Sequence, residues 1–247
     1  MLKYDKKYDL RVSDFNSADY LKPSAILDLC QSIADVHASK IGVGYNDLLE
    51  KDLVWVLLRM RYDVVSEVGF DQKTVRAVTW PHRAGKVDFD RDYLIENENG
   101  DVLVKASSKW CVINYKTRRI ALGKGVAYPE DDYCEDENYV DGLKKLADFD
   151  LDGGEEYEGI AGVSCLDHNG HVNNIKYSDF ILDAIGKEDR KIKSFEINYI
   201  KEMQMGNFKI VHKFIQSENE NTPDKRLIKG FSNGDEAFRA VVKYKKR

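Results

Sequence analysis

Three polar side chains that together could carry out chemistry stand two residues apart in the second half of the chain, namely Asp167, Asn169 and His171. A carboxylate can activate water, an amide can donate to a carbonyl oxygen, and an imidazole can orient a group or shuttle a proton. Hydrolysis of an activated acyl group needs these roles and no cofactor. The same residues also suit an ordinary polar turn that caps a helix, with Asn173 or Asn174 as the N-cap. The residue types alone favour the capping turn over a catalytic site.

A helix is predicted directly after this turn, over about 174–186. One face of it carries apolar residues at helical spacing, and these are Tyr177, Phe180, Ile181, Ala184 and Ile185. The first N–H groups of a helix are unpaired and carry partial positive charge. We therefore expect the helix start to be a suitable place for a polarised carbonyl oxygen.

A second carboxylate, Glu202, ends a predicted strand over 192–202. An acidic side chain at a strand end beside the helix start could act as general base. The residues alone favour the other interpretation, a surface glutamate paired with Lys201 or with a lysine on a neighbouring strand. A zinc site through His168 and His171 is not supported, because the other ligands are missing at any recognisable spacing.

Composition narrows the class of protein. The net charge of −5, with 33% charged residues, disfavours nucleic acid as the main partner, because phosphate binding needs a basic excess. The four cysteines form no CxxC pair and no zinc spacing, which predicts reduced thiols. The first seven residues lack the apolar core of a signal peptide, and we find no apolar run long enough to span a bilayer. We expect a cytoplasmic protein with no membrane insertion, no metal and no cofactor.

The order of predicted elements occurs twice. Each half reads as a strand, a polar turn, a helix and then four strands, the last two joined by Asn99-Gly100 in one half and Asn233-Gly234 in the other. This pattern predicts an α+β double (tandem) hotdog, in which two antiparallel sheets are each wrapped round a central helix. We expect an N-terminal hotdog over 1–125 and a C-terminal hotdog over 156–247. Between them we predict an acidic, solvated linker over 126–155, with one short helix near 139–147.

The two polar turns also correspond. We align Asp14 and Asn16 with the aspartate and asparagine of the second half, and Tyr20 with His171, which requires a two-residue difference in turn length. In this alignment only the second half carries the full set of polar groups.

The stretch 167–177 resembles the D-x-N-x-H-V-N-N-x-x-Y motif of the acyl-acyl-carrier-protein (acyl-ACP) thioesterases, a family found in plants and bacteria. The stretch 199–202 resembles the family's later Y-x-x-E segment. Further matching segments follow in order through the first half, at 55–57, 79–81, 91–93, 107–110 and 116–119. The resemblance therefore covers nearly the whole chain, and it suggests a bacterial member similar to the plant fatty-acyl-ACP thioesterases.

The resemblance implies a double hotdog thioester hydrolase that releases free fatty acid from acyl-ACP in fatty acid biosynthesis. It implies a catalytic set of Asp167, Asn169, His171 and Glu202. A cysteine proposed as the family's nucleophile follows the glutamate, but Met203 stands there in this sequence. Because a methionine cannot attack as a thiolate, the sequence favours hydrolysis driven by a carboxylate. Whether Asp167 or Glu202 is the base or nucleophile stays open.

The resemblance also implies a substrate site and a partner. We expect the acyl tail in the first hotdog, and we expect the substrate to be contacted by Ile26, Leu29, Ile33, Trp55, Asn173 and Asn174. Acyl carrier protein is the implied partner, an acidic protein with a phosphopantetheine arm. Candidate docking contacts are Arg83, Lys86, Arg91, Arg118 and Arg119. A homodimer is expected by resemblance only.

Three other readings keep the fold. An acyl-CoA thioesterase differs only in the carrier of the acyl group. A hydratase or dehydratase would use a histidine with a carboxylate, and Asn169 beside Asp167 argues against it. A non-catalytic acyl-binding protein would bind acyl chains without hydrolysing a thioester.

Overall fold

The computed structural model describes residues 3–126 and 133–246. The chain divides into two compact units, Met1–Lys144 and Lys145–Arg247, so the division falls inside the predicted linker. The limits predicted for the two hotdogs and the linker stay predictions.

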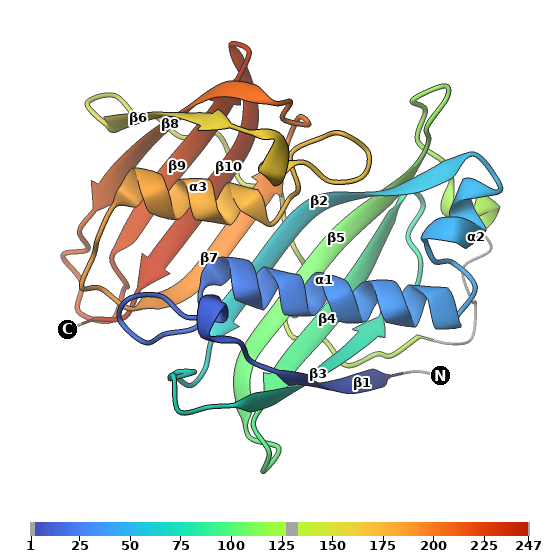
Figure 1. Ribbon diagram of the computed structural model, residues 1–247, viewed down its shortest axis with the longest axis horizontal. Coiled ribbons are helices and arrows are strands. Elements are labelled where there is room, and N and C mark those ends of the chain that lie inside the picture. The colour runs from blue at the N-terminus through green and yellow to red at the C-terminus, as the bar shows by residue number, and fades with distance from the viewer. Residues whose placement is uncertain (1–2, 127–132, 247) are drawn as a thin grey trace. The chain divides into compact units, whose positions relative to one another are not determined.

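The N-terminal unit is an antiparallel sheet with one long helix, α1 (Pro23–Lys40), against one face (Figure 1). The strand order is β1-β3-β4-β5-β2. The strands are β1 (Tyr4–Asp9), β2 (Leu53–Val64), β3 (Thr74–Pro81), β4 (Asp88–Glu96) and β5 (Val102–Asn114). Short helices lie at Val12–Asp14, at α2 (Tyr45–Leu49) and at Gly123–Gly125. The five strands and the long helix predicted for this half are present, whereas α2 was not predicted.

Helix α1 follows from its sequence. Pro23 occupies the first turn, where a missing N–H costs no hydrogen bond. Ile26, Leu29 and Ile33 are 3%, 8% and 0% exposed, so the apolar stripe is buried against the sheet. The helix ends at Lys40, and Gly42 follows with φ of 75°, a backbone region that favours glycine.

Residues 133–144 lie across the sheet face that carries Asp92, and we call them the strap. Trp80 Nε1 donates to the Asp136 carbonyl at 2.7 Å, and Asn138 N donates to Asp92 Oδ2 at 2.6 Å. Arg59 Nη1 donates to the Leu143 carbonyl at 2.7 Å. The backbone of this part of the predicted linker is therefore hydrogen-bonded to the sheet, while its acidic residues 135–137 are exposed as expected.

The short helix predicted near 139–147 is wrong, because these residues form turns and irregular backbone. Their acidic composition does not reveal the hydrogen bonds that a folded sheet offers them. The residues 127–132 of the predicted linker lie outside the described residues.

The C-terminal unit has the same plan, with α3 (Lys176–Ile185) against its sheet (Figure 1). The strand order is β7-β10-β9-β8-β6. The strands are β6 (Glu155–Ala161), β7 (Ile192–Tyr199), β8 (Gly206–Ile215), β9 (Lys225–Ser232) and β10 (Asp235–Tyr244). Strand β6 ends at Ala161, and a one-turn helix, Val163–Cys165, leads into the polar turn.

Aromatic side chains fill the space between α3 and its sheet. The Tyr177 ring meets those of Tyr199 and Phe238 at centroid distances of 5.3 Å each, and Phe180 stacks on Phe208 at 4.4 Å. Gly230 lies beneath the Phe238 ring, where an added Cβ would come within 1.9 Å of a ring carbon. Only glycine fits at that position. No helix in the described part of the chain is long and apolar enough to cross a membrane.

Candidate active site

The polar turn after Val163–Cys165 is a closed loop organised by the Asp167 carboxylate. Asp167 Oδ1 accepts hydrogen bonds from the backbone N–H groups of Asn169 at 2.9 Å and His171 at 3.2 Å. Asp167 N donates to the His171 carbonyl at 2.8 Å, and Gly170 N donates to the Asp167 carbonyl at 3.1 Å. Gly170 has φ of 79°, which the tight turn requires. The loop fixes the backbone of His171 and leaves the Asn169 side chain exposed.

The N-terminal unit contains the same loop around Asn16. Asn16 Oδ1 accepts from Ala18 N and Tyr20 N at 3.0 Å each. Asn16 N donates to the Tyr20 carbonyl at 2.9 Å, and Asp19 N donates to the Asn16 carbonyl at 3.0 Å. Each bond has a counterpart around Asp167.

The alignment predicted for the two turns is therefore wrong at its start. Asn16, not Asp14, corresponds to Asp167, and Tyr20 corresponds to His171 with no difference in loop length. The sequence pairs Asp14 with Asp167 because both are aspartates. The hydrogen bonds instead show which residues of the two loops correspond. The C-terminal loop has a carboxylate where the N-terminal loop has a neutral amide.

His171 and Glu202 are brought together from separate segments. His171 Nε2 lies 3.4 Å from Glu202 Oε2, and the side chains are 30% and 36% exposed. Glu202 follows the end of β7 in the connection to β8. A carboxylate beside an imidazole that remains open to solvent can orient the ring and take up a proton.

The chain next to Glu202 is anchored. Val172 N donates to the Met203 carbonyl at 2.9 Å, and Met203 N donates to Tyr177 Oη at 2.9 Å. The Met203 side chain is 0% exposed. Position 203, where the resemblance places a cysteine, thus points into the core.

The start of α3 differs from the prediction. The helix begins at Lys176 with Ile175 as N-cap, so neither asparagine occupies that position. Asn173 Oδ1 instead accepts from Ile175 N at 2.9 Å, and the Asn173 carbonyl accepts from Lys176 N at 2.9 Å. The Asn174 carbonyl accepts from Tyr199 Oη at 3.2 Å.

Several backbone N–H groups at the start of α3, which the sequence predicts to be unpaired, already donate hydrogen bonds within the protein. The N–H groups of Ile175, Lys176 and Ser178 all have acceptors within the turn. The exposed Asn169 amide is therefore the better placed donor for a substrate oxygen.

Comparison with models of known protein families identifies the family of this chain. A model of the acyl-ACP thioesterase N-terminal domain matches residues 1–123, and a model of the C-terminal domain of the same family matches residues 160–246. The chain belongs to the acyl-ACP thioesterase family. The second match contains the loop, the Glu202 position and the helix α3.

Curated relatives agree with this family. The chain is 33% identical over 183 residues to the palmitoyl-acyl carrier protein thioesterase of Arabidopsis thaliana, covering 67% of this chain and 43% of the relative. It is 31% identical over 185 residues to an acyl-[acyl-carrier-protein] hydrolase of Cuphea viscosissima, covering 68% of this chain and 44% of the relative. The chain thus spans less than half the length of these relatives.

Solved structures support the double hotdog fold of this acyl-ACP thioesterase family member. An acyl-ACP thioesterase from Bacteroides thetaiotaomicron superposes with a TM-score of 0.84 at 22% identity over 98% of both chains. A 12:0-ACP thioesterase from Umbellularia californica gives a TM-score of 0.87 at 20% identity, over 100% of this chain and 98% of that one. The predicted α+β double hotdog is confirmed.

The residues expected to contact the acyl tail lie in the N-terminal unit of this family member. Ile26, Leu29 and Ile33 are buried in the core between α1 and the sheet. Trp55 on β2 is half-buried, and its Nε1 donates to the Val43 carbonyl at 2.8 Å. These positions are apolar as an acyl chain requires, and their contact with substrate stays a proposal.

Four of the five basic residues expected to dock the carrier are exposed, namely Arg83, Lys86, Arg118 and Arg119. Arg91 is the exception. It is 7% exposed, and its Nη1 donates to His37 Nδ1 at 3.0 Å and to Thr79 Oγ1 at 3.2 Å. Arg91 therefore faces α1 rather than a partner protein, and we withdraw it as a docking contact.

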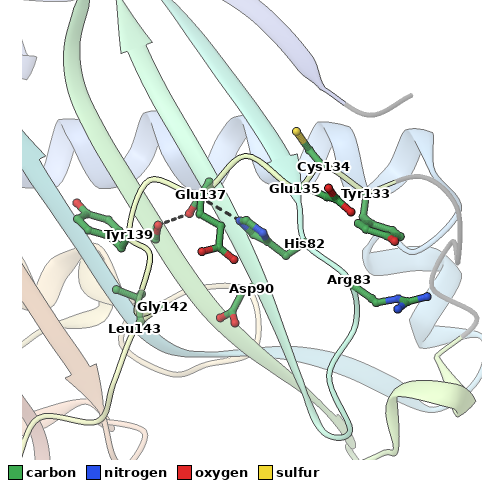
Figure 2. Close-up of a pocket in the computed structure, with 12 residues that line it drawn as sticks. His82, Arg83, Asp90, Tyr133, Cys134, Glu135, Glu137, Tyr139, Gly142 and Leu143 are labelled. Carbon is green, nitrogen blue, oxygen red and sulfur yellow. Dashed lines mark hydrogen bonds and ion pairs between the residues drawn. The ribbon is translucent and has the colours of Figure 1, made fainter.

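A pocket of about 450 Å³ lies under the strap, lined by the N-terminal unit alone (Figure 2). Figure 2 shows His82 and Asp90 at the sheet, with Glu135 and Glu137 on the strap that crosses it. His82 Nε2 lies 3.2 Å from Asp92 Oδ2, and Ser107 Oγ donates to Asp92 Oδ1. None of the proposed catalytic residues lines it. Among residues 3–126 and 133–246, no group of His, Cys, Asp or Glu side chains is arranged to hold a metal ion.

His82 couples this region to pH. Burial alone would lower the pKa of His82, but the hydrogen bond to Asp92 and the negative charges of Asp92, Asp90 and Glu137 raise it above the ordinary value of 6.5. The folded chain therefore binds this proton more tightly than the unfolded chain does. The resulting stability is fully present below a pH of about 6.5 and is lost as pH rises through the higher folded pKa.

His82→Asn is expected to remove this part of the pH dependence. The wild-type free energy of unfolding, relative to the variant, should fall as pH rises from about 6.5. Urea unfolding at a series of pH values measures the difference. Equal slopes for wild type and His82→Asn would contradict the role of His82.

Proposed function

We propose that this chain hydrolyses thioesters of acyl carrier protein and releases free fatty acid, in fatty acid biosynthesis. The observation that carries the proposal is the 3.4 Å contact between His171 and Glu202, beside a loop that Asp167 organises. Membership of the family supports the substrate class, because both curated relatives are named for acyl carrier protein substrates.

In the mechanism that we propose, Glu202 is the general base. Its carboxylate takes a proton from a water molecule, directly or through His171, as the water oxygen bonds to the thioester carbonyl carbon. The tetrahedral intermediate then collapses, the C–S bond breaks, and the proton passes to the leaving thiolate. The products are a carboxylic acid and the free thiol, so no redox step or cofactor is needed.

Asn169 and Asp167 have complementary roles in this mechanism. The exposed Asn169 amide donates to the carbonyl oxygen, which gains negative charge as water attacks. Asp167 holds the His171 backbone through its Oδ1 atom. Its carboxylate, unlike an amide, can also help Glu202 to activate the water molecule.

We assign the acyl tail to the interior of the N-terminal hotdog, along Ile26, Leu29, Ile33 and Trp55. Asn173 and Asn174 belong to the turn that follows the catalytic loop, where the thioester end of the substrate would lie. The assignment of the acyl tail is supported by the apolar side chains that line this interior. The assignment of the two asparagines is supported by their place in the family motif.

We assign carrier docking to Arg83, Lys86, Arg118 and Arg119. They flank two connections, between β3 and β4 and after β5, and their charge suits an acidic carrier. Attraction between exposed charges weakens as salt rises, so docking through them would be sensitive to ionic strength. Cytoplasmic location and a homodimer also stay proposals.

One assay tests the function and separates the alternatives. Purified protein is given acyl carrier protein thioesters of several chain lengths and the matching acyl-CoA thioesters, with Asp167→Ala as control. We expect hydrolysis of the carrier protein thioesters, higher kcat/KM on that carrier, and loss of turnover in the control. Preference for CoA would favour an acyl-CoA thioesterase. Binding of acyl chains without hydrolysis of any thioester would overturn the proposal in favour of an acyl-binding protein.

A further inference from the structure

We propose that Tyr177 is a positioning residue of this site: its buried hydroxyl fixes the backbone of Met203 and so holds the Glu202 carboxylate against His171. The catalytic consequence rests on the function proposed above. The hydrogen-bonded clamp is a property of the fold and can be tested without any substrate.

The clamp acts on both polar groups of one residue. Met203 N donates to Tyr177 Oη at 2.9 Å, and the Met203 carbonyl accepts from Val172 N at 2.9 Å. The first bond ties Met203 to the first turn of α3, and the second ties it to the residue that follows His171. The residue next to Glu202 is thereby attached to the two elements that carry the rest of the site.

Glu202 needs such an anchor because it lies outside regular secondary structure. Strand β7 ends at Tyr199 and β8 begins at Gly206. Lys201, Glu202 and Gln204 are exposed, and Met203 alone among residues 201–205 is buried. An exposed glutamate side chain has several rotamers, so the 3.4 Å approach to His171 depends on where the backbone starts.

Tyr177 is suited to hold that backbone. It is 1% exposed, and its ring packs against those of Tyr199 and Phe238. Burial raises the pKa of Tyr177 to about 12, which the Met203 N–H bond opposes and the charges of Glu202 and Asp167 reinforce. The phenol therefore stays neutral at physiological pH and accepts from the Met203 N–H at a fixed position.

The clamp also accounts for a methionine at position 203. The backbone of this residue makes both contacts, and its side chain needs only to fill a buried space. A methionine fills such spaces readily because its side chain is flexible and apolar. On this view the site uses position 203 as an anchor rather than as a nucleophile.

Tyr177→Phe tests the clamp, because it removes the hydroxyl and keeps the packed ring. We expect the Met203 amide to exchange with solvent about fivefold faster or more, the change that corresponds to one lost hydrogen bond. We expect kcat on an acyl carrier protein thioester to fall by about 10- to 100-fold, as for a catalytic group moved out of place, with KM within about twofold of wild type. The pH profile of kcat/KM should also change shape.

Tyr244→Phe is the matched control. Tyr244 is 2% exposed in the same unit, at the end of β10, and removing its hydroxyl touches neither Met203 nor Glu202. It should leave the Met203 exchange rate, kcat and the pH profile at wild-type values. If the two variants have equal thermal stability, the fall in kcat of Tyr177→Phe cannot be due to a general loss of folded protein.

Each outcome is decisive. Unchanged exchange of the Met203 amide in Tyr177→Phe would show that the clamp is not made. Faster exchange with wild-type kcat and pH profile would show that the clamp does not position Glu202. If the wild-type protein hydrolysed no thioester, the proposed function would fail, and the exchange measurement would still decide whether Tyr177 holds Met203.

Discussion

Glu202→Gln is expected to lower kcat on an acyl carrier protein thioester by about 100- to 10,000-fold, the range typical of removing a general base. Glutamine has the same shape and can still hydrogen-bond to His171, which lies 3.4 Å from the carboxylate. It cannot accept a proton from water. The substrate should still bind, so KM should stay near the wild-type value.

Glu218→Gln provides the control for this substitution. Glu218 is an exposed glutamate of the same unit, between β8 and β9, so its charge can be removed without touching the loop. Its kcat should equal that of wild type, which shows that the loss does not come from net charge. If Glu202→Gln kept kcat within about tenfold of wild type, below the range expected for a general base, Glu202 could not be the base.

The elements of the fold could be predicted because their signals are local. The Asn-Gly pair at 233–234 sits between two strand patterns, and the structure has β9 and β10 paired across it. The apolar spacing of 177–185 gives α3 within two residues at its start. Such signals depend only on neighbouring residues in the sequence, so they can be interpreted without knowledge of the rest of the chain.

The incorrect predictions share one physical cause. In each case the structure is set by hydrogen-bond partners that are distant in the sequence. An acidic segment is usually solvated, and the acidic side chains of the strap are exposed, yet its backbone is held because Trp80 and Arg59 donate to its carbonyls. An arginine is usually exposed, yet Arg91 is buried because His37 and Thr79 accept its hydrogen bonds. Neither partner can be identified from the segment itself.

The candidate site could be predicted from the sequence only in part. The motif places Asp167, Asn169 and His171 in one loop, which the structure confirms as a closed turn. The approach of Glu202 to His171 was inferred from resemblance and from a strand end, and periodicity could not give it. Tyr177 ends the motif and lies in the apolar stripe of α3, but neither pattern identifies the Met203 N–H as its hydrogen-bond donor.

The largest structural and catalytic effects at one position are expected at Asp167, where two substitutions separate two roles. Asp167→Ala removes the acceptor of two backbone N–H groups, those of Asn169 and His171. The loss resembles that of a helix cap and should lower the free energy of unfolding by about 0.5–2 kcal/mol. Because the His171 backbone is then no longer fixed, turnover should also be abolished.

Asp167→Asn should keep the loop and remove only the charge. The N-terminal unit already shows that an asparagine can form this loop, since Asn16 Oδ1 accepts the same two N–H groups at 3.0 Å each. The loop itself therefore needs no carboxylate, and the charge at position 167 is what the C-terminal unit adds. We expect stability close to wild type and kcat lower by about 10- to 100-fold, because a neutral amide cannot help to activate the water molecule as a carboxylate can.

Asn16→Asp in the N-terminal loop is the reciprocal control. It adds the charge where no histidine follows, since Tyr20 stands in place of His171, and kcat should not change. Thermal unfolding and kcat of the three variants together measure both roles. Wild-type kcat in Asp167→Asn would reduce Asp167 to a residue that only shapes the loop. A loss of stability in Asp167→Asn equal to that of Asp167→Ala would contradict the correspondence between the two loops.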